Sequence, residues 1–472
     1  MLTLLTILAC GGPAETPAPE TTTSEEASAE VAASAETPPL EELPNIIVIT
    51  LDTTRADAIG TFGGPEGITP TVDSWADRGV AFEWAFSHSP TTLSSHSSLF
   101  SGLDPHQHGV PRNGFPLSDE VETLAEVLQE TGYDTLGVIG ASVINEEMGM
   151  AQGFRLFDDS VRIDMGRRFE DRGDRVTRRT RTLLQQRDRE RPLHLWVHYY
   201  DAHSPYEAPA THQVKFVDPR HRINPDRADG HKRLADWIRA GDFPPEQMEY
   251  LVGLYHSEVS WVDYQLDRLF THLDEEGILE DAIVVITSDH GEMFGEVYEH
   301  PLGHGFEVDT WATRVPLVIA RTQNGPTPAR VTQPVKLSDV APTVLSMAGI
   351  NRSLGTGQNL TGLMRGEPLQ ADPIFFEASK PEQVEIEGVW NNTPKERGVL
   401  IDGHIYIASP LTPEDPFQLF LLDEQQSRVE RARVLPQLRE ALDGWDEAAP
   451  AWRSESFSSE TEEALRALGY IE

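Results

Sequence analysis

NIIVITLD (residues 45–52) and AIVVITSDH (residues 282–290) decide the fold, because each is a short apolar run that ends in an aspartate. Continuous apolar runs of this length are typical of strands buried on both faces, and such strands belong to parallel sheets. In open α/β sheets, ligands bind outside the carboxyl ends of the strands. Asp52, Asp289 and His290 therefore fall where a binding site is expected.

The ligand chemistry of these three residues indicates a metal. Two carboxylates and an imidazole at one edge of a sheet would repel each other or lose solvation unless a cation neutralised them. Oxygen and nitrogen ligands of this kind suit a divalent metal ion. Either aspartate alone could instead cap a helix. We predict a metal site made by Asp52, Asp289 and His290.

The surrounding sequence alternates further apolar runs with amphipathic helices, which predicts an α/β fold with a doubly wound, mostly parallel sheet flanked by helices. Further strands are expected at 135–139, 193–198 and 315–320, and helices at 121–128, capped by Ser118 or Asp119, and at 259–273. The polar segment 205–245 is expected to form a loop insertion over the site that helps to select the substrate.

The pattern changes after Gly349. Residues 398–408 and 417–422 are expected to form two strands separated by a proline-rich turn, and 428–443 and 459–468 to form helices. We therefore expect a second, smaller unit in this part of the chain.

Three further segments carry groups that can act on a phosphate or sulfate. TTLSSHSSLFSGLDPHQHG (91–109) is a hydroxyl-rich turn that leads into a helix, while HYYDAHSPY (198–206) and GHG (303–305) offer histidines. Hydroxyls at a helix start can simply cap it. A helix N-terminus also binds anions, so capping and catalysis are compatible.

Taken in order, these segments resemble the sulfatase family of the alkaline phosphatase superfamily. The resemblance spans about residues 43–350 and continues more weakly to the C-terminus, where LRALGY (465–470) is similar to the family's usual ending. It implies a sulfatase-like catalytic domain at 43–350 and a C-terminal subdomain at 351–472 with a small antiparallel sheet. It also implies a metal-dependent enzyme that cleaves a sulfuric or phosphoric ester of a small molecule, glycan or lipid.

The nucleophile position departs from the family pattern. Sulfatases carry a Cys/Ser-x-Pro-x-Arg turn whose first residue is oxidised to formylglycine. The alignment with this chain places Thr92 at that residue and His96 at the arginine. Threonine is not a substrate for that oxidation, so the resemblance shifts to superfamily members with a threonine nucleophile, which act on phosphodiesters, phosphonates or phospholipid headgroups. We predict that Thr92 binds the metal and attacks phosphorus or sulfur, and that His96 binds the substrate.

Other expected roles come from the same resemblance. His203 matches an active-site histidine that could protonate the leaving oxygen, and His304 lies where the family binds the transferred group. Gly140 and Ser142 stand where many sulfatases have a sulfate-binding lysine and histidine, which favours phosphorus as the centre attacked. His290 stands where many sulfatases carry asparagine. Because an imidazole ligand also suits metals other than calcium, the candidate metals include manganese, magnesium and zinc as well as calcium.

Composition indicates the setting in which the protein works. The formal net charge is −39, and only 5 of the 38 basic residues are lysine. So negative a chain argues against nucleic acid or an anionic membrane surface as a partner, and we expect a salty environment that screens the repulsion.

Residues 1–10 resemble a lipoprotein signal that ends in Cys10, and 11–42 have the composition of a disordered acidic linker. We therefore expect an exported lipoprotein, in the periplasm or at the cell surface, whose membrane contact is a lipid anchor on Cys10.

Two other functions stay open at this stage. A transferase could pass a phospholipid headgroup to a cell-surface acceptor, although such enzymes often carry several membrane spans. A non-catalytic lipoprotein that binds anions is the remaining alternative.

Overall fold

The computed structural model describes residues 38–161, 170–218, 220, 230–297, 301–378, 396–408, 417–421 and 435–449. The predicted signal, nearly all of the predicted linker and the predicted helix at 459–468 lie outside these residues.

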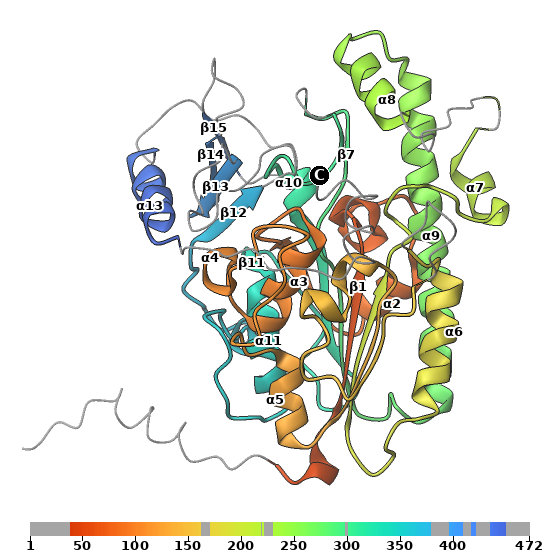
Figure 1. Cartoon of the computed structure of the whole chain (residues 1–472), viewed down its shortest axis with the longest axis vertical. Coiled ribbons are helices and arrows are strands. Elements are labelled where there is room, and N and C mark those ends of the chain that lie inside the picture. The colour runs from red at the N-terminus through yellow and green to blue at the C-terminus, as the bar shows by residue number, and fades with distance from the viewer. Residues whose placement is uncertain are drawn as a thin grey trace, which may run out of the picture. The chain divides into compact units, whose positions relative to one another are not determined.

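Among the described residues, nine strands form the central sheet (Figure 1). β9 runs antiparallel to β2 and β6, and the other pairs are parallel, so the sheet is mostly parallel as predicted. The order is β10 (Ala329–Val331), β2 (Val80–Phe86), β9 (Arg314–Arg321), β6 (Ala282–Ser288), β1 (Asn45–Leu51), β5 (Leu193–Tyr199), β3 (Asp134–Val138) and β4 (Leu156–Asp158), with β11 (Val335–Lys336) beside β2.

The register of the three middle strands sets the position of the site. Thr50 of β1 lies opposite His198 of β5 and Thr287 of β6. Because these strands are parallel, their carboxyl ends meet at one edge, and Asp52 and Asp289 follow directly there.

Helices cover both faces of the sheet, which confirms the doubly wound architecture. Alternate β1 side chains point to opposite faces: Ile46 and Val48 belong to one core, and Ile47 and Ile49 to the other. The first core contains α3 (Thr92–Ser101), α5 (Leu124–Thr131) and α11 (Val340–Met347), and the second contains α2 (Pro70–Ala76), α6 (Gly173–Leu184) and α9 (Pro245–Glu275).

The start of α5 differs from the prediction. Thr123 caps it, since its Oγ1 accepts from the N–H of Glu126 at 3.3 Å while the Glu126 carboxylate accepts from the N–H of Thr123 at 2.8 Å. This reciprocal pair satisfies two helix-start amides, and neither Ser118 nor Asp119 caps the helix.

Residues 205–245 also differ from the predicted loop, because their described part contains two helices and leads into α9. α7 (Ala210–Phe216) packs on α9, and α8 (Gly230–Arg239) follows it. The short helices α4 (Pro105–His108), α10 (Thr310–Thr313) and α12 (Thr361–Met364) and the small pair β7 (Met293–Phe294) and β8 (Leu302–Gly303) complete the unit, with 3₁₀ turns at Leu40–Glu42, Ala56–Ala58, Gly60–Phe62, Ser142–Ile144, Glu146–Met148 and Leu337–Asp339.

The described part of the C-terminal subdomain is an antiparallel sheet covered by one helix. Its strands are β12 (Ile374–Ala378), β13 (Glu396–Ile401), β14 (His404–Ala408) and β15 (Phe417–Leu421), and its helix is α13 (Leu435–Glu447). The single strand predicted at 398–408 is wrong: Asp402 (φ 48°) and Gly403 (φ 73°) turn the chain into a hairpin. Phe376 and Ile405 pack with Trp84 and Phe86 of the catalytic domain.

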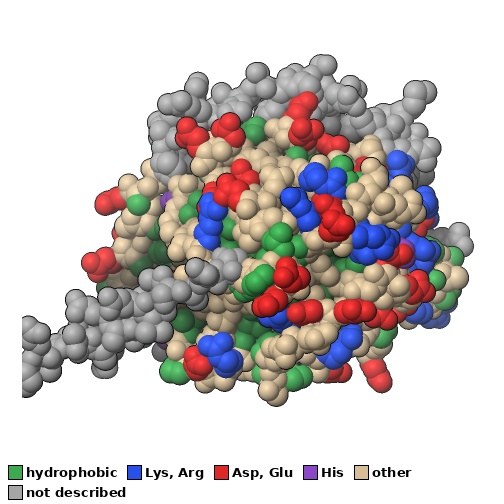
Figure 2. Space-filling model, turned by 90° about the horizontal axis from the view of Figure 1, so that it is seen from below, with side chains coloured by type: hydrophobic (Ala, Val, Ile, Leu, Met, Phe, Trp, Pro, Cys, Tyr) green, Lys and Arg blue, Asp and Glu red, His purple; other side chains and the backbone are tan. Residues whose placement is uncertain are grey.

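Charged side chains of both signs are mixed on the face seen in Figure 2, where red and blue groups lie beside one another. Within the described ranges, no helix combines the length and the apolar character needed to span a bilayer.

Candidate active site

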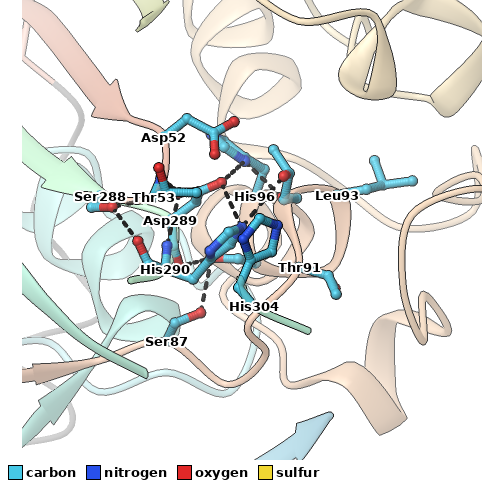
Figure 3. Close-up of polar contacts among 12 residues, drawn as sticks. Asp52, Thr53, Ser87, Thr91, Leu93, His96, Ser288, Asp289, His290 and His304 are labelled. Carbon is cyan, nitrogen blue, oxygen red and sulfur yellow. Dashed lines mark hydrogen bonds and ion pairs between the residues drawn. The ribbon is translucent and has the colours of Figure 1, made fainter. Parts of the chain in front are cut away.

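Asp52 and Asp289 lie side by side at the carboxyl edge of the sheet and are fully buried (Figure 3). Asp289 Oδ1 accepts from the backbone N–H of Thr53 at 3.1 Å and of His290 at 2.8 Å. Thr53 takes the left-handed conformation (φ 51°) to make this contact, which costs about 1–3 kcal/mol for a non-glycine residue. Both carboxylate oxygens of Asp52 and Oδ2 of Asp289 have no hydrogen-bond partner in the described part of the chain.

Thr92 opens α3 next to His290. Its Oγ1 lies 3.4 Å from Nε2 of His290. Nδ1 of His290 lies 3.0 Å from the Gly291 carbonyl, so it carries the proton and leaves the Nε2 lone pair toward Thr92. The structure thus brings the predicted nucleophile and the predicted metal ligands together.

His304 and His203 complete one side of the site. The His304 ring centroid lies 4.4 Å from that of His290 and 5.0 Å from that of His203, and His304 Nδ1 lies 3.4 Å from the Glu292 carboxylate. His203 Nδ1 donates to the Ser204 carbonyl at 2.6 Å. Burial, followed by His304, lowers the pKa of His203 to about 3, so the free site holds this ring neutral.

His96 lies beneath Thr92 and is fully buried. Its Nδ1 donates to the Thr92 carbonyl at 2.7 Å, and Nε2 accepts from the Thr50 hydroxyl at 3.0 Å, since that hydroxyl itself accepts from Trp196 Nε1–H. The predicted direct contact of His96 with substrate does not fit this geometry, because the protein already engages both ring nitrogens. The ring instead orients the first turn of α3.

The prediction missed two polar residues of the site. His198, the last residue of the predicted strand 193–198, places Nε2 3.2 Å from Asp52 Oδ2. Asn113 Oδ1 accepts a hydrogen bond from the N–H of Leu93 at 2.7 Å. The buried Nδ2 of Asn113 has no partner among the described residues. The strand-end position of His198 was a usable signal, whereas Asn113 lies in an irregular segment with none.

Within the described ranges, two groups of side chains have ligand atoms close enough for a cation: Asp52, Asp289 and His290, and His96, His198 and Asp289, each within 4.8 Å. The first group fits better, because His96 Nδ1 carries a proton. Burial raises the pKa of Asp52 well above its ordinary value, and the Asp289 and Glu292 charges raise it further. Buried carboxylates with unpartnered oxygens and a free imidazole lone pair match the ligands of a divalent metal.

A family model of sulfatases matches residues 44–350. The chain belongs to the sulfatase family. This sulfatase is 25% identical over 362 residues to the uncharacterized sulfatase YidJ of Escherichia coli, an alignment that covers 67% of this chain and 70% of that protein. It is 26% identical over 387 residues to the multifunctional alkaline phosphatase superfamily protein PehA of Trinickia caryophylli, covering 65% and 74%.

The solved structures bear out the fold of this sulfatase. The phosphonate monoester hydrolase of Agrobacterium radiobacter has a TM-score of 0.63 at 20% identity, covering 86% of this chain and 94% of that one. The family and its relatives make the chain a hydrolase of ester bonds in the alkaline phosphatase superfamily, and such sulfatases generally use a divalent metal.

The sulfatase keeps little room at Gly140, the position at which the resemblance predicted a sulfate-binding lysine in many sulfatases. A Cβ at Gly140 would lie 3.0 Å from the His198 carbonyl oxygen and 3.2 Å from the Tyr200 amide nitrogen. A long side chain at Gly140 would therefore crowd the end of β5.

Proposed function

We propose that this sulfatase-family enzyme hydrolyses a phosphoric or phosphonic ester, in preference to a sulfuric ester, through a covalent intermediate on Thr92. The observation that carries the proposal is the Thr92 hydroxyl, placed at the start of a ten-residue helix and 3.4 Å from His290. Threonine cannot become formylglycine, but its oxygen can attack phosphorus directly.

Asp52, Asp289 and His290 would hold the divalent metal, with Thr92 as a further ligand. When bound, the metal lowers the pKa of the threonine hydroxyl and neutralises charge on the group being transferred. Thr92 loses its hydroxyl proton to water, and Oγ1 forms the new bond to phosphorus while the bond to the leaving oxygen breaks. Water then attacks phosphorus and releases Thr92.

The remaining polar groups suit the transferred group and the leaving oxygen. Asn113 Nδ2 can donate to an oxygen of the anion, since it is buried without a partner among the described residues. His304, beside His290, can contact another. His203 can protonate the leaving oxygen once the charge of the bound anion raises the pKa of its ring from about 3.

Hydrolysis of matched 4-nitrophenyl sulfate, phosphate, phosphodiester and phosphonate esters by residues 43–472 with added divalent metals tests the proposal. We expect the phosphorus esters to be cleaved fastest, and Thr92→Ala to lower kcat/KM at least about a thousandfold. Ser101→Ala, which removes a hydroxyl at the other end of α3, is the matched control. Sulfate cleavage that survives Thr92→Ala would contradict the assignment of the nucleophile.

We also propose that Cys10 carries a lipid that anchors the exported enzyme to a bacterial membrane. Expression of Cys10→Ser tests this proposal: the variant is expected in the soluble fraction. Its recovery with the membranes would contradict a lipid anchor.

A further inference from the structure

A small cavity of about 50 Å³ reaches the edge of the candidate active site at His203. It lies between the segment before α6, the loop after β5 and the first half of α9. Its charged lining residues are Glu170, Asp171, Arg172, Asp201, Glu207 and Glu258. None of these has a role in the mechanism proposed above.

The environment of Asp201 indicates that this cavity binds a ligand. It is 7% exposed, and its Oδ1 accepts from the Gly173 N–H at 2.8 Å. Oδ2 is buried and has no hydrogen-bond partner within the described ranges. A buried carboxylate oxygen without a partner is costly, because the charge loses its hydration and gains nothing in return.

Glu258 places a second buried carboxyl beside it. This residue of α9 is 2% exposed and accepts from the backbone N–H groups of Glu207 and Ala208. Burial, reinforced by the Asp201 charge, raises the pKa of Glu258 to about 9, and burial raises the pKa of Asp201 to about 7. A cation between them would favour the ionised form of both.

The positive side chain in the cavity lining, Arg172, also acts on these carboxyls, since its charge lowers the pKa of Asp201. Arg172 lines the cavity, but its Nε donates to Asp174 at 2.7 Å. Asp171 is paired with Arg175 at 3.0 Å and Arg179 at 2.8 Å. Apart from the paired Asp171, four acidic side chains line the cavity against one arginine, so it favours a cation next to His203.

The spacing favours an organic cation over a metal ion. Among the described residues, the groups of three ligands within 4.8 Å of one another both contain Asp289, and the carboxyls of this cavity form no such group. An ammonium group carries three N–H donors that reach separate acceptors. A volume near 50 Å³ holds a few water molecules or one small ammonium group.

We propose that this cavity is a specificity subsite for a primary ammonium group on the leaving side of the substrate, held by Asp201 and Glu258. Because the cavity lies beside His203, we assign it to the leaving-group side of the substrate. This assignment rests on the proposed role of His203 at the leaving oxygen. The substrate is then an ester of an amino alcohol or amino sugar.

Calorimetric binding of 2-aminoethanol and of propan-1-ol, in which a methyl group replaces the ammonium, tests the subsite without any catalytic step. We expect the amine to bind about tenfold or more tightly to the wild type, and Asp201→Asn to remove most of this difference. Asparagine keeps the oxygen that accepts from Gly173 and removes only the charge. Equal binding of the two alcohols by the wild type would overturn the subsite.

Kinetics then place the subsite in the reaction. We expect kcat/KM for 2-aminoethyl esters of phosphate and sulfate to exceed that for the propyl esters about tenfold, with Asp201→Asn and Glu258→Gln each reducing this ratio. Asp267→Asn, which removes an exposed carboxylate from the same helix, should leave the ratio unchanged. Hydrolysis with no preference between 2-aminoethyl and propyl esters would overturn the proposed subsite but leave the proposed hydrolase function standing. Amine binding with no hydrolysis of any ester would overturn the proposed function and keep the subsite.

Discussion

At the scale of single residues, the site depends on two buried carboxylates, three of whose oxygens receive no hydrogen bond within the described ranges. Asp52 and Asp289 are both fully buried. The protein would tolerate this arrangement if a cation neutralised the pair, and a metal bound there would then be part of the folded structure as well as of the proposed chemistry.

Removal of the metal is therefore expected to lower both activity and thermal stability. A ligand present at about 100 times its Kd stabilises a protein by about 2.7 kcal/mol. We expect chelation to lower the melting temperature of the wild type and restored manganese, zinc, magnesium or calcium to raise it. Asp289→Asn should respond weakly to both treatments, as measured by differential scanning calorimetry. A metal-free protein with full activity would contradict the mechanism.

His96 is expected to act through the position of Thr92. Replacement by Ala would leave the Thr92 carbonyl and the Thr50 hydroxyl without their partner and open a cavity, at a cost of about 2–4 kcal/mol in the free energy of unfolding. His96→Gln, which keeps a donor and an acceptor, should recover part of this stability. In steady-state kinetics the Gln variant should lower kcat more than it raises KM, whereas a rise in KM alone would indicate direct contact with substrate.

The sequence predicted the residues that follow strongly patterned strands. Asp52, Asp289 and His290 could be found because apolar runs lead into them, and Thr92, His203 and His304 because of family resemblance. The role of His96 could not be found, since only the fold shows that Thr50 and the Thr92 carbonyl occupy its two nitrogens. The pairing of His198 with Asp52 likewise depends on the register of β1 and β5.

At the scale of elements, α9 places Glu258 against the loop that carries Asp201. The raised pKa values of these carboxyls make stability depend on pH. Since the folded protein binds these protons more tightly than the unfolded chain, their contribution is complete below about pH 4 and is lost as the pH rises toward 7 for Asp201 and 9 for Glu258.

Glu258→Gln is therefore expected to flatten the decline in unfolding free energy between pH 5 and 9, by an amount on the order of 1–3 kcal/mol. Urea denaturation at several pH values measures it, with Asp267→Asn as the control for a lost surface charge. A wild-type stability that rises across this range, or an identical decline in the Gln variant, would contradict the assignment.

Helices and strands could be predicted where the hydrophobic pattern of the sequence was strong and where tertiary contacts had little influence on the secondary structure. β1, β5, β6 and β9 were found because both faces of each strand are buried. β2 was missed, although it lies next to β9 in the sheet. The hairpin at Asp402 and Gly403 carried a usable signal, since Asp-Gly is typical of tight turns between strands. The two helices in 205–245 were not recognised in a polar segment, where propensity is weak.

At the scale of the whole molecule, the charge of −39 opposes folding through mutual repulsion. The face in Figure 2 mixes basic with acidic side chains, so part of the repulsion is offset locally. We expect the melting temperature of residues 43–472 to rise between about 0.01 M and 1 M sodium chloride, as the screening length falls from about 30 Å to about 3 Å. A melting temperature that stays constant would contradict an adaptation to salt.

The central claim, a covalent intermediate on Thr92, is tested most directly by mass spectrometry of the enzyme quenched during turnover of a 4-nitrophenyl phosphorus ester. The account predicts one added phosphoryl or phosphonyl group on the peptide that contains Thr92, and no such adduct in Thr92→Ala. An adduct on another residue, or full turnover by Thr92→Ala, would contradict it.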